Sequence, residues 1–468
     1  MRDDARDNAA KTVAIIGAGP VGLAAAAHAV ERGLRPIVLE AGGKVGHAVR
    51  QWSHVRMFSP WRYNIDRASE RLLRDAGWSS PDPSHHPTGG ELAQHYLEPL
   101  ALRTELAQHI ETGARVLSIA RSGFDKVKTA GREHAPFEIR CRNGKGAMTV
   151  LADAVVDASG TWFSPNPAGA NGLEATGEAE HAGRIAYGMP DVLGRDRRRY
   201  AGKTVAVLGS GHSAVGTIID LKRLQTEQPE TQIIWLLRGT DPQKAFGGGT
   251  GDQLAARGEL GLAFAAIVRG GGVRVEAGFR LSHIAEASSR LRLGAGSACC
   301  GRHVLADELV VATGFRPDLA FLREVRSALD PALECPPALA PLIDPNLHSC
   351  GTVRPHGARE LAQPEPGLYV AGMKSYGRAP TFLMLTGYEQ VRSIMADIAG
   401  DRAAAERVEL VLPETGVCSA PSPASAPLTS PARASGCCGG PAPTDQSACC
   451  RADEDAKARG RPGCGCGV

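Results

Sequence analysis

The stretch TVAIIGAGPVGLAAAAHAVERG, from Thr12 to Gly33, decides the fold of this chain. An apolar run, a glycine-rich turn and an alanine-rich run follow one another, which predicts a buried strand, a tight turn and a helix. Gly17, Gly19 and Gly22 hold the glycine places of the G-x-G-x-x-G pattern. The first makes the turn, the second lets a pyrophosphate approach the backbone, and the third lets helix and strand pack closely. The stretch therefore predicts a Rossmann-like α/β unit that binds a dinucleotide.

A second strand and an acid follow at the spacing that such a unit needs. The strand RPIVLE ends at Glu40, 18 residues after Gly22, where a carboxylate can bind the ribose hydroxyls of an adenine nucleotide. Because strand, turn, helix, strand and acid occur in this order, we predict a nucleotide site rather than a glycine-rich turn without a ligand.

The pattern returns near the middle of the chain, in KTVAVLGSGHSAVGTIIDL. Gly209 and Gly211 hold the first two glycine places, and Ala214 holds the third, which the fingerprint tolerates. Ser213 is predicted to cap the following helix or to line the dinucleotide site. Two Rossmann-like units in one chain predict two nucleotides.

The second unit differs from the first at the end of its next strand. QIIWLLRG places Arg238 where the first unit has an acid. A guanidinium at this point can hold a 2′-phosphate, which favours NADPH over NADH. The alternative is an exposed arginine at a strand end, with no ligand.

Composition narrows the classes of function. The 468 residues include 53 Lys and Arg against 50 Asp and Glu, and aromatic residues make up 5%, so neither a basic face nor a stacking surface for nucleic acid is indicated. The first residues mix both signs of charge and lack the apolar centre of a signal peptide. We therefore expect a cytoplasmic protein without a membrane span, whose cysteines are thiols or metal ligands rather than disulfides.

Three motifs together resemble those of two-dinucleotide-binding flavoproteins. They are Gly17-Ala-Gly19, the run ATGF that begins at Ala312, and the run LYVAG that ends at Gly372. This superfamily includes the thioredoxin-reductase-like enzymes and the flavin-containing monooxygenases. The resemblance covers roughly residues 11–412 and implies bound FAD and NADPH.

The resemblance also implies a domain order, in which an NADPH-binding domain is inserted into an FAD-binding domain. We predict the first part of the FAD domain at 11–165, the NADPH domain at 166–310, and the return part of the FAD domain at 311–412. Further strands end in small-residue turns that we expect to contact the cofactors, at Gly160, Thr313, Gly314 and Gly372. Residues 413–468 are rich in Pro, Ala and Ser and predict a disordered, cysteine-rich tail.

Two departures from the disulfide reductases point to a different electron acceptor. Those enzymes carry a redox-active C-x-x-C beside the flavin, whereas Cys141, Cys335 and Cys350 are isolated and Cys299 and Cys300 are adjacent. The reductases also usually place Asp where this chain has a methionine after Gly372. Molecular oxygen therefore becomes the expected acceptor, and the resemblance implies a monooxygenase that uses a flavin C4a-hydroperoxide to oxidise a soft nucleophile.

The segment QWSHVRMFSPWRYN, from Gln51 to Asn64, is rich in Trp, His and Arg. We expect it to line the reactive face of the flavin, with Trp52, His54, Arg56 and Asn64 as candidate catalytic residues. The alternative is a packed aromatic loop beneath the FAD.

The predicted tail carries clustered thiols, which favour soft ions such as trivalent arsenic, mercury, cadmium, zinc or copper(I). The candidate ligands are Cys437, Cys438, Cys449, Cys450, Cys464 and Cys466. A thiol tail on a monooxygenase body is similar to the flavin-dependent monooxygenases of bacterial arsenic-resistance operons. That resemblance implies detoxification of a trivalent inorganic or organic arsenical by oxidation to the pentavalent form. A low-complexity extension and a zinc-binding appendage remain alternatives for the tail.

Three other functions stay open at this point. One is an NADPH-dependent flavin reductase of soft metal ions or disulfides. Another is a monooxygenase that hydroxylates nitrogen or sulfur in a small metabolite. The third is a metal-binding or sensing protein in which the flavin is structural.

Overall fold

The structure, a computed structural model, describes residues 10–249, 252, 254–296, 301–347, 353–380 and 382–410. The chain divides into two compact units, Met1–Ala420 and Pro421–Val468, and every described residue belongs to the first. The predicted tail, including its six candidate metal ligands, lies outside the described residues.

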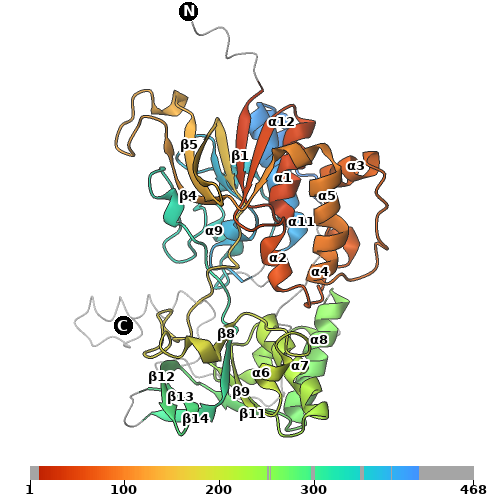
Figure 1. Cartoon of the computed structure of the whole chain (residues 1–468), viewed down its shortest axis with the longest axis vertical. Helices are drawn as coiled ribbons and strands as arrows, with labels where there is room; N and C mark the ends of the chain where they lie inside the picture. The colour runs from red at the N-terminus through yellow and green to blue at the C-terminus, as the bar shows by residue number, and fades with distance from the viewer. Residues whose placement is uncertain are drawn as a thin grey trace, which may run out of the picture. The chain divides into compact units, whose positions relative to one another are not determined.

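A five-stranded parallel sheet, in the order β16-β7-β1-β2-β3, forms the outer half of the fold, to which the first part and the return part of the chain contribute. Figure 1 shows β1 of this sheet beside α1. Its strands are β1 (Thr12–Ile16), β2 (Arg35–Glu40), β3 (Ile110–Thr112), β7 (Ala154–Asp157) and β16 (Leu368–Val370). β16 returns from the far end of the sequence and pairs with β7. All five residues of β1 are buried, as the unbroken apolar run of a central parallel strand requires.

A second five-stranded parallel sheet forms the inserted half, in the order β11-β10-β9-β15-β8. Its strands are β8 (Ile185–Tyr187), β9 (Thr204–Leu208), β10 (Gln232–Leu237), β11 (Arg274–Ala277) and β15 (Glu308–Val311). β15 ends one residue beyond the predicted boundary at residue 310. The two parallel sheets confirm the predicted α/β fold with two Rossmann-like units.

Each half also contains a three-stranded antiparallel sheet. The outer half has β4 (Arg115–Arg121), β5 (Phe137–Asn143) and β6 (Gly146–Ala152), and the inserted half has β12 (Leu281–Ala287), β13 (Arg290–Ala295) and β14 (Arg302–Ala306). These sheets contribute apolar side chains to the same hydrophobic clusters as the parallel strands, so each covers a buried surface of its half.

Helices complete both halves. α1 (Pro20–Glu31) packs against α11 (Met384–Ala399) and α3 (Arg67–Asp75), and the buried alanines of α1 permit this close packing. The remaining α-helices are α2 (His47–Gln51), α4 (Gly89–Leu92), α5 (Glu98–Arg103), α6 (Arg197–Tyr200), α7 (His212–Glu227), α8 (Ala255–Arg269), α9 (Ala340–Ile343), α10 (Ala358–Leu361) and α12 (Arg402–Glu406). None of the helices in the described ranges combines the length and apolar character that a bilayer crossing demands.

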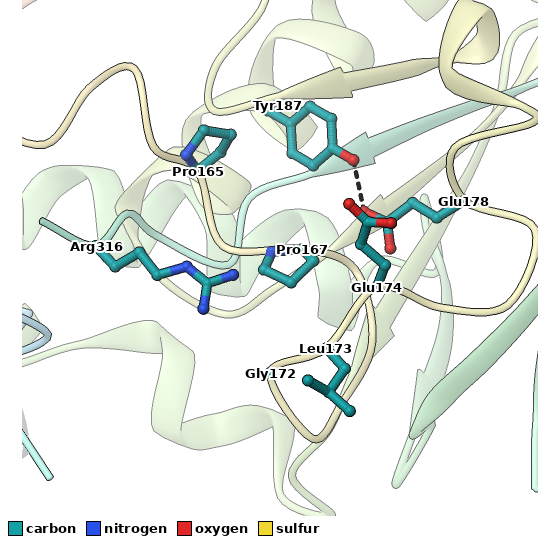
Figure 2. A pocket seen from close by; sticks show the side chains of 8 residues that line it. All are labelled: Pro165, Pro167, Gly172, Leu173, Glu174, Glu178, Tyr187 and Arg316. Atoms are coloured by element: carbon teal, nitrogen blue, oxygen red, sulfur yellow. Dashed lines mark hydrogen bonds between the residues drawn. The ribbon is translucent and has the colours of Figure 1, made fainter. Parts of the chain in front are cut away.

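Two chain segments connect the halves, one through Pro165 and the other through Phe315, and they run side by side. Pro165 forms an antiparallel bridge with Phe315, and the backbone N–H of Arg316 donates to the carbonyl of Ser164 at 2.9 Å. Pro165 and Arg316 also line a cavity beside the connections (Figure 2).

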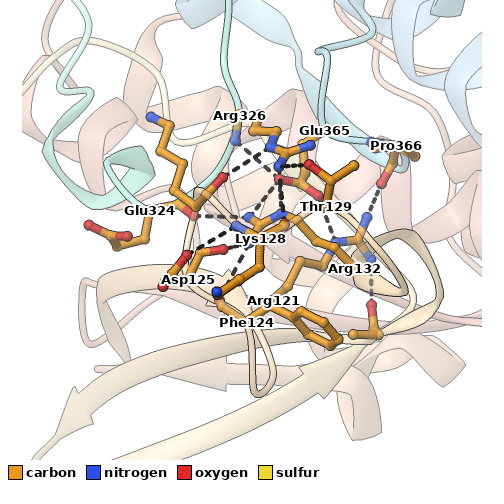
Figure 3. A network of polar contacts seen from close by, with 12 residues as sticks. Arg121, Phe124, Asp125, Lys128, Thr129, Arg132, Glu324, Arg326, Glu365 and Pro366 are labelled. Atoms are coloured by element: carbon orange, nitrogen blue, oxygen red, sulfur yellow. Dashed lines mark hydrogen bonds and ion pairs between the residues drawn. The ribbon is translucent and has the colours of Figure 1, made fainter.

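A buried polar network fastens the return segment to the antiparallel sheet of the outer half (Figure 3). The carboxylate of Glu365, 1% exposed, accepts from Arg121 Nε at 2.9 Å and from Arg132 Nη2 at 2.8 Å. The backbone N–H of Arg326 donates to the same carboxylate at 3.1 Å. One carboxylate thus faces two guanidinium groups, and backbone carbonyls stabilise the excess positive charge. The carbonyl of Ala135 accepts from Arg121, and two other carbonyls accept from Arg132.

Candidate functional site

The first glycine turn has the geometry that its three glycines predict. Gly17 has φ +96°, and a Cβ placed on it would lie 2.9 Å from the carbonyl oxygen of Ala158. A Cβ on Gly22 would lie 1.9 Å from the carbonyl oxygen of Gly17, so only hydrogen fits between helix and strand. Around Gly19, which caps α1, the Cβ position meets nothing within 4 Å. The free amides of the first turn of α1 face this open position and suit a pyrophosphate.

Glu40 stands at the end of β2 and is buried. Its Oε2 accepts from the N–H of Ala18 at 2.8 Å, and its Oε1 accepts from the N–H of Gly42 at 2.7 Å. The carboxylate therefore holds the glycine turn in place. Each oxygen keeps a further lone pair with which it can accept a ribose hydroxyl.

A buried ion pair at the same sheet edge was not anticipated from the sequence. Lys374 Nζ lies 2.6 Å from Asp157 Oδ2, and both side chains are fully buried. Ser159 Oγ accepts from Lys374 at 3.0 Å and donates to Asp157 Oδ1 at 2.7 Å. Ser159 also lies against Gly17, because its Cα is 2.9 Å from the Cβ position there. The pair thus joins the return segment to the first glycine turn.

The turn after β16 is held by a second buried network. The N–H of Gly372, which has φ +69°, donates to Gln390 Oε1 at 2.7 Å. Gln390 Nε2 lies 2.9 Å from Ser375 Oγ and 2.8 Å from His356 Nε2. Burial lowers the pKa of His356, so a neutral imidazole accepts from the amide. The predicted cofactor turn at Gly372 is therefore rigidly built.

Gly160, another predicted cofactor contact, follows β7 in the same half. It has φ +71°, and its Cβ position meets nothing within 4 Å. This combination of left-handed backbone and open space matches a close approach by a ligand.

The second glycine turn repeats the plan of the first. Gly209 has φ +133°, and a Cβ on it would lie 2.3 Å from the carbonyl oxygen of Ala312. Gly211 caps α7 and has open space around its Cβ position, while Ala214 is buried and packs 3.6 Å from the Cβ position of Gly209. Ser213 is half-buried, and its carbonyl accepts from the Thr217 hydroxyl within α7.

The other predicted contacts of this half lie open at the sheet edge. Arg238 is exposed, and its Nη1 donates to the carbonyl of Ala170 at 3.3 Å. Thr313 and Gly314, directly after β15, are exposed as well. An exposed guanidinium with one long hydrogen bond can turn towards a phosphate, so the edge fits NADPH.

The segment predicted to face the flavin is largely engaged within its own loops. Trp52 packs on Gly89, where a Cβ would lie 2.5 Å from the indole ring. Arg56 is exposed, donates to the carbonyl of His86 at 2.5 Å and lies 3.8 Å from the carboxylate of Glu91. These contacts match the packed-loop alternative, and a catalytic role for Trp52 and Arg56 stays a prediction.

Asn64 and His54 differ in how many partners they have. Asn64 is buried; its amide donates to the carbonyls of Ser59 and Pro60, and its oxygen accepts from the Ser59 hydroxyl. By contrast, the buried Nε2 of His54 has no hydrogen-bond partner among the described residues. Of the four candidates, the structure leaves His54 with a free ring nitrogen, and its catalytic role also stays a prediction.

The described cysteines are poor nucleophiles. Burial raises the pKa of Cys141 to about 11 and that of Cys335 to about 12, so both stay protonated at neutral pH. Cys299, Cys300 and Cys350 lie outside the described residues, as does the tail. Within the described part of the chain, no group of three or more His, Cys, Asp or Glu side chains could hold a metal ion.

Comparison with known proteins agrees with this geometry. Residues 14–336 match the family model of the pyridine nucleotide-disulphide oxidoreductases. The flavin-containing monooxygenase FMO GS-OX-like 2 of Arabidopsis thaliana is 25% identical over 237 residues, which are 46% of this chain and 48% of the relative. The match therefore spans about half the length of that curated relative.

The similar solved structures include a monooxygenase and a disulfide reductase. The cadaverine monooxygenase DfoA of Erwinia amylovora, bound to FAD, has a TM-score of 0.60 at 14% identity, covering 87% of this chain and 98% of that chain. The bacillithiol disulfide reductase Bdr of Bacillus cereus has a TM-score of 0.59 at 20% identity, covering 83% and 99%. At these identities the likeness shows the shared fold.

Proposed function

The chain belongs to the pyridine nucleotide-disulphide oxidoreductase family and is an FAD- and NADPH-dependent oxidoreductase; we propose that it is a monooxygenase acting on a soft nucleophile. One observation carries this proposal. The glycine turns for two nucleotides are complete, whereas the described cysteines are isolated, buried and of raised pKa. The described residues therefore provide sites for electron transfer from NADPH to the flavin, but they include no thiol pair that could accept the electrons from the flavin. Similarity to the plant flavin-containing monooxygenase supports oxygen as the acceptor.

The substrate we propose is a trivalent inorganic or organic arsenical. NADPH supplies two electrons as a hydride, the arsenic lone pair supplies two more, and one proton from solvent completes the water that is formed. One oxygen atom bonds to arsenic, which becomes pentavalent, and the other leaves as water. FAD, when bound, supplies the oxygen-activating chemistry.

The chain's own residues have binding and positioning tasks in this reaction. The first turns of α1 and α7 bind the two pyrophosphates through backbone N–H groups. Lys374 and Asp157 hold the return segment against the first glycine turn. His54 is the candidate that would hydrogen-bond the flavin, because its Nε2 is buried without a partner among the described residues.

The tail thiols have a collecting role in this proposal. Clustered thiolates bind trivalent arsenic and other soft ions, and tethering a captured arsenical to the enzyme's own chain would raise its effective concentration. This part of the proposal rests on the sequence, from Cys437 to Cys466. It places the protein in arsenic resistance.

A second candidate is an NADPH-dependent flavin reductase of disulfides or soft metal ions. It is favoured by the fold shared with the bacillithiol disulfide reductase. In that case oxygen would not be consumed in step with NADPH.

The test measures NADPH consumption and oxygen uptake by the purified flavoprotein, with and without monomethylarsonous acid, together with the oxidation state of arsenic. We expect the arsenical to accelerate both rates and to emerge pentavalent. A chain that ends at residue 412 should keep the maximal rate and need more arsenical to reach it. Oxidation of NADPH without oxygen uptake would favour the reductase. Oxygen uptake stimulated by an amine or thioether, but not by the arsenical, would assign a nitrogen- or sulfur-hydroxylating monooxygenase.

A further inference from the structure

A cavity of about 440 Å³ lies beside the two connections between the halves (Figure 2). Its walls come from both connections, from the end of β8 and from the loop that leads from the first connection to β8. The lining residues are Pro165, Pro167, Gly172, Leu173, Glu174, Glu178, Tyr187 and Arg316. The volume is within the range of small-molecule sites, about 300–1,000 Å³. The prolines and Leu173 supply apolar surface, and the other long side chains are polar.

Two opposite charges in this cavity lack protein partners. The guanidinium of Arg316 makes no side-chain hydrogen bond or ion pair with any described residue. The carboxylate of Glu174 likewise makes none within the described ranges. The two groups do not pair with each other, although both line the same space. Arg316 is half-buried and Glu174 is exposed at the mouth of the cavity. Each charge is an open binding position, because a ligand charge can pair with it.

The third charge in the cavity is already satisfied and fixes the wall. Glu178 is buried, accepts from the N–H groups of Ala168 and Ala175, and accepts from the Tyr187 hydroxyl at 2.5 Å. Burial, with the nearby Glu178 charge, raises the pKa of Tyr187, so the phenol stays protonated and keeps donating. Glu178 has no cation among these partners, so its negative charge adds to that of Glu174 on one side of the cavity.

We propose that this cavity binds a small zwitterion, an amino acid or ω-amino acid, with its carboxylate on Arg316 and its ammonium group beside Glu174. The guanidinium presents a planar pair of donors that suits a carboxylate. The acidic side, Glu174 with Glu178 behind it, suits an ammonium group. The apolar walls accommodate the methylene chain between the two charges. This site is separate from the substrate proposed above and does not depend on that proposal.

The test is calorimetric titration of the FAD-loaded full chain, without turnover. The probes are glycine, 4-aminobutyrate, 5-aminopentanoate, 6-aminohexanoate and lysine, with pentanoate and pentylamine as single-charge controls. We expect one zwitterion to bind, and the single-charge analogues to bind at least about tenfold more weakly, because each lost charge-assisted contact is worth roughly tenfold in affinity.

Two variants locate the site. Arg316→Gln and Glu174→Gln should each weaken zwitterion binding by about tenfold or more. Both should fold normally, since neither side chain holds a partner among the described residues, and an unchanged visible flavin spectrum checks this. Arg359→Gln is the matched control, because Arg359 has an exposed guanidinium outside the cavity, and it should bind like the wild type.

Three results would overturn the proposal. No zwitterion binds at millimolar concentration; binding occurs but is unaffected by Arg316→Gln; or NADP⁺ displaces the bound zwitterion competitively. The third result would assign the cavity to the nucleotide site of the inserted half.

Discussion

Each of the two Rossmann-like halves has a glycine turn of the same plan, but the residues at the carboxyl ends of their parallel strands differ in burial. In the outer half, Glu40 and Asp157 are buried at the strand ends, where backbone amides, Lys374 and Ser159 bind them. In the inserted half, the corresponding edge is open, and Gly211 and Arg238 are exposed there.

This difference matches the tasks of the two nucleotides. FAD stays bound through many turnovers, so an edge that is fixed in advance reduces the entropy lost on binding. NADPH must enter and leave in each turnover, and we expect it at the open edge, where the exposed guanidinium of Arg238 suits exchange. The comparison therefore predicts that changes in the outer half remove the flavin or the fold, whereas changes in the inserted half alter nucleotide choice and rate.

The largest effect is expected at Gly22, the glycine of α1 that packs against the Gly17 turn. Gly22→Ala places a Cβ 1.9 Å from the carbonyl of Gly17, and overpacking against backbone should cost more than about 3 kcal/mol. We expect insoluble or flavin-free protein. Gly19→Ala is the matched variant, because its Cβ enters open space. It should fold, yet bind FAD about tenfold more weakly, as measured by fluorescence titration of the apoprotein. Normal FAD binding by both variants would refute the assigned tasks of the glycines.

Lys374→Met should come next, because it leaves the Asp157 carboxylate buried without a counter-charge. We expect a loss of about 3–5 kcal/mol in the free energy of unfolding, together with loss of flavin during purification. The double variant Lys374→Met/Asp157→Asn should recover most of that loss, since neither charge is then left alone. Urea unfolding followed by flavin and tryptophan fluorescence measures both. A single variant as stable as the wild type would show that the pair does not hold the edge.

The sequence could predict the glycine turns but not this ion pair. Gly17, Gly19 and Gly22 act through local spacing, which is visible in a short window. Lys374 and Asp157 meet only because β16 returns beside β7, and nothing local marks a lysine as buried. The methionine after Gly372 indicated a departure from the disulfide reductases, yet the charge that faces the first glycine turn stands one residue later.

A buried histidine should make the outer half sensitive to alkaline pH. His28 on α1 lies 3.0 Å from Asp66, which caps α3. Burial, the largest single influence, opposes protonation, but the charges and hydrogen bonds of Asp66 and Glu31 together outweigh it and raise the pKa of His28 from 6.5 to about 9. The stabilisation is therefore complete below pH 6.5 and is lost as the pH rises through about 9, by up to about 3 kcal/mol.

His28→Gln should flatten that dependence. Urea unfolding from about pH 6 to about pH 10 measures it. A wild-type protein whose stability does not fall across this interval would contradict the raised pKa. His95→Gln is the control, because His95 is exposed, and it should keep the wild-type slope.

Arg238 gives a smaller effect, confined to the inserted half. Arg238→Glu should lower the preference for NADPH over NADH by roughly ten- to a hundredfold, because a charge-assisted bond to phosphate is worth about 1.5–3 kcal/mol. FAD content and stability should not change. Steady-state kinetics with NADPH and with NADH measures this preference. Arg238→Gln should give a preference between those of the wild type and Arg238→Glu. An unchanged ratio would assign Arg238 to the exposed strand-end alternative.

The segment from Gln51 to Asn64, predicted to face the flavin, shows what residue type alone cannot predict. Residue type suggested that Trp52, Arg56 and Asn64 serve catalysis, because aromatic and polar side chains cluster there. Trp52 and Arg56 have partners in the chain around α4, at Gly89 and His86, whereas Asn64 bonds within its own loop. Composition cannot distinguish a side chain that packs a loop from one that faces a ligand.

The most direct test of the two-nucleotide account is anaerobic mixing of NADPH with the wild type and with Gly209→Ala. The substitution forces a side chain into φ +133° and places its Cβ 2.3 Å from the carbonyl of Ala312, entirely within the inserted half. The account predicts that both proteins carry FAD, that NADPH bleaches the wild-type flavin rapidly, and that the variant flavin bleaches at least about a hundredfold more slowly although dithionite reduces it fully. Equal bleaching by NADPH, or loss of FAD from the variant, would contradict the division of the two nucleotides between the two halves.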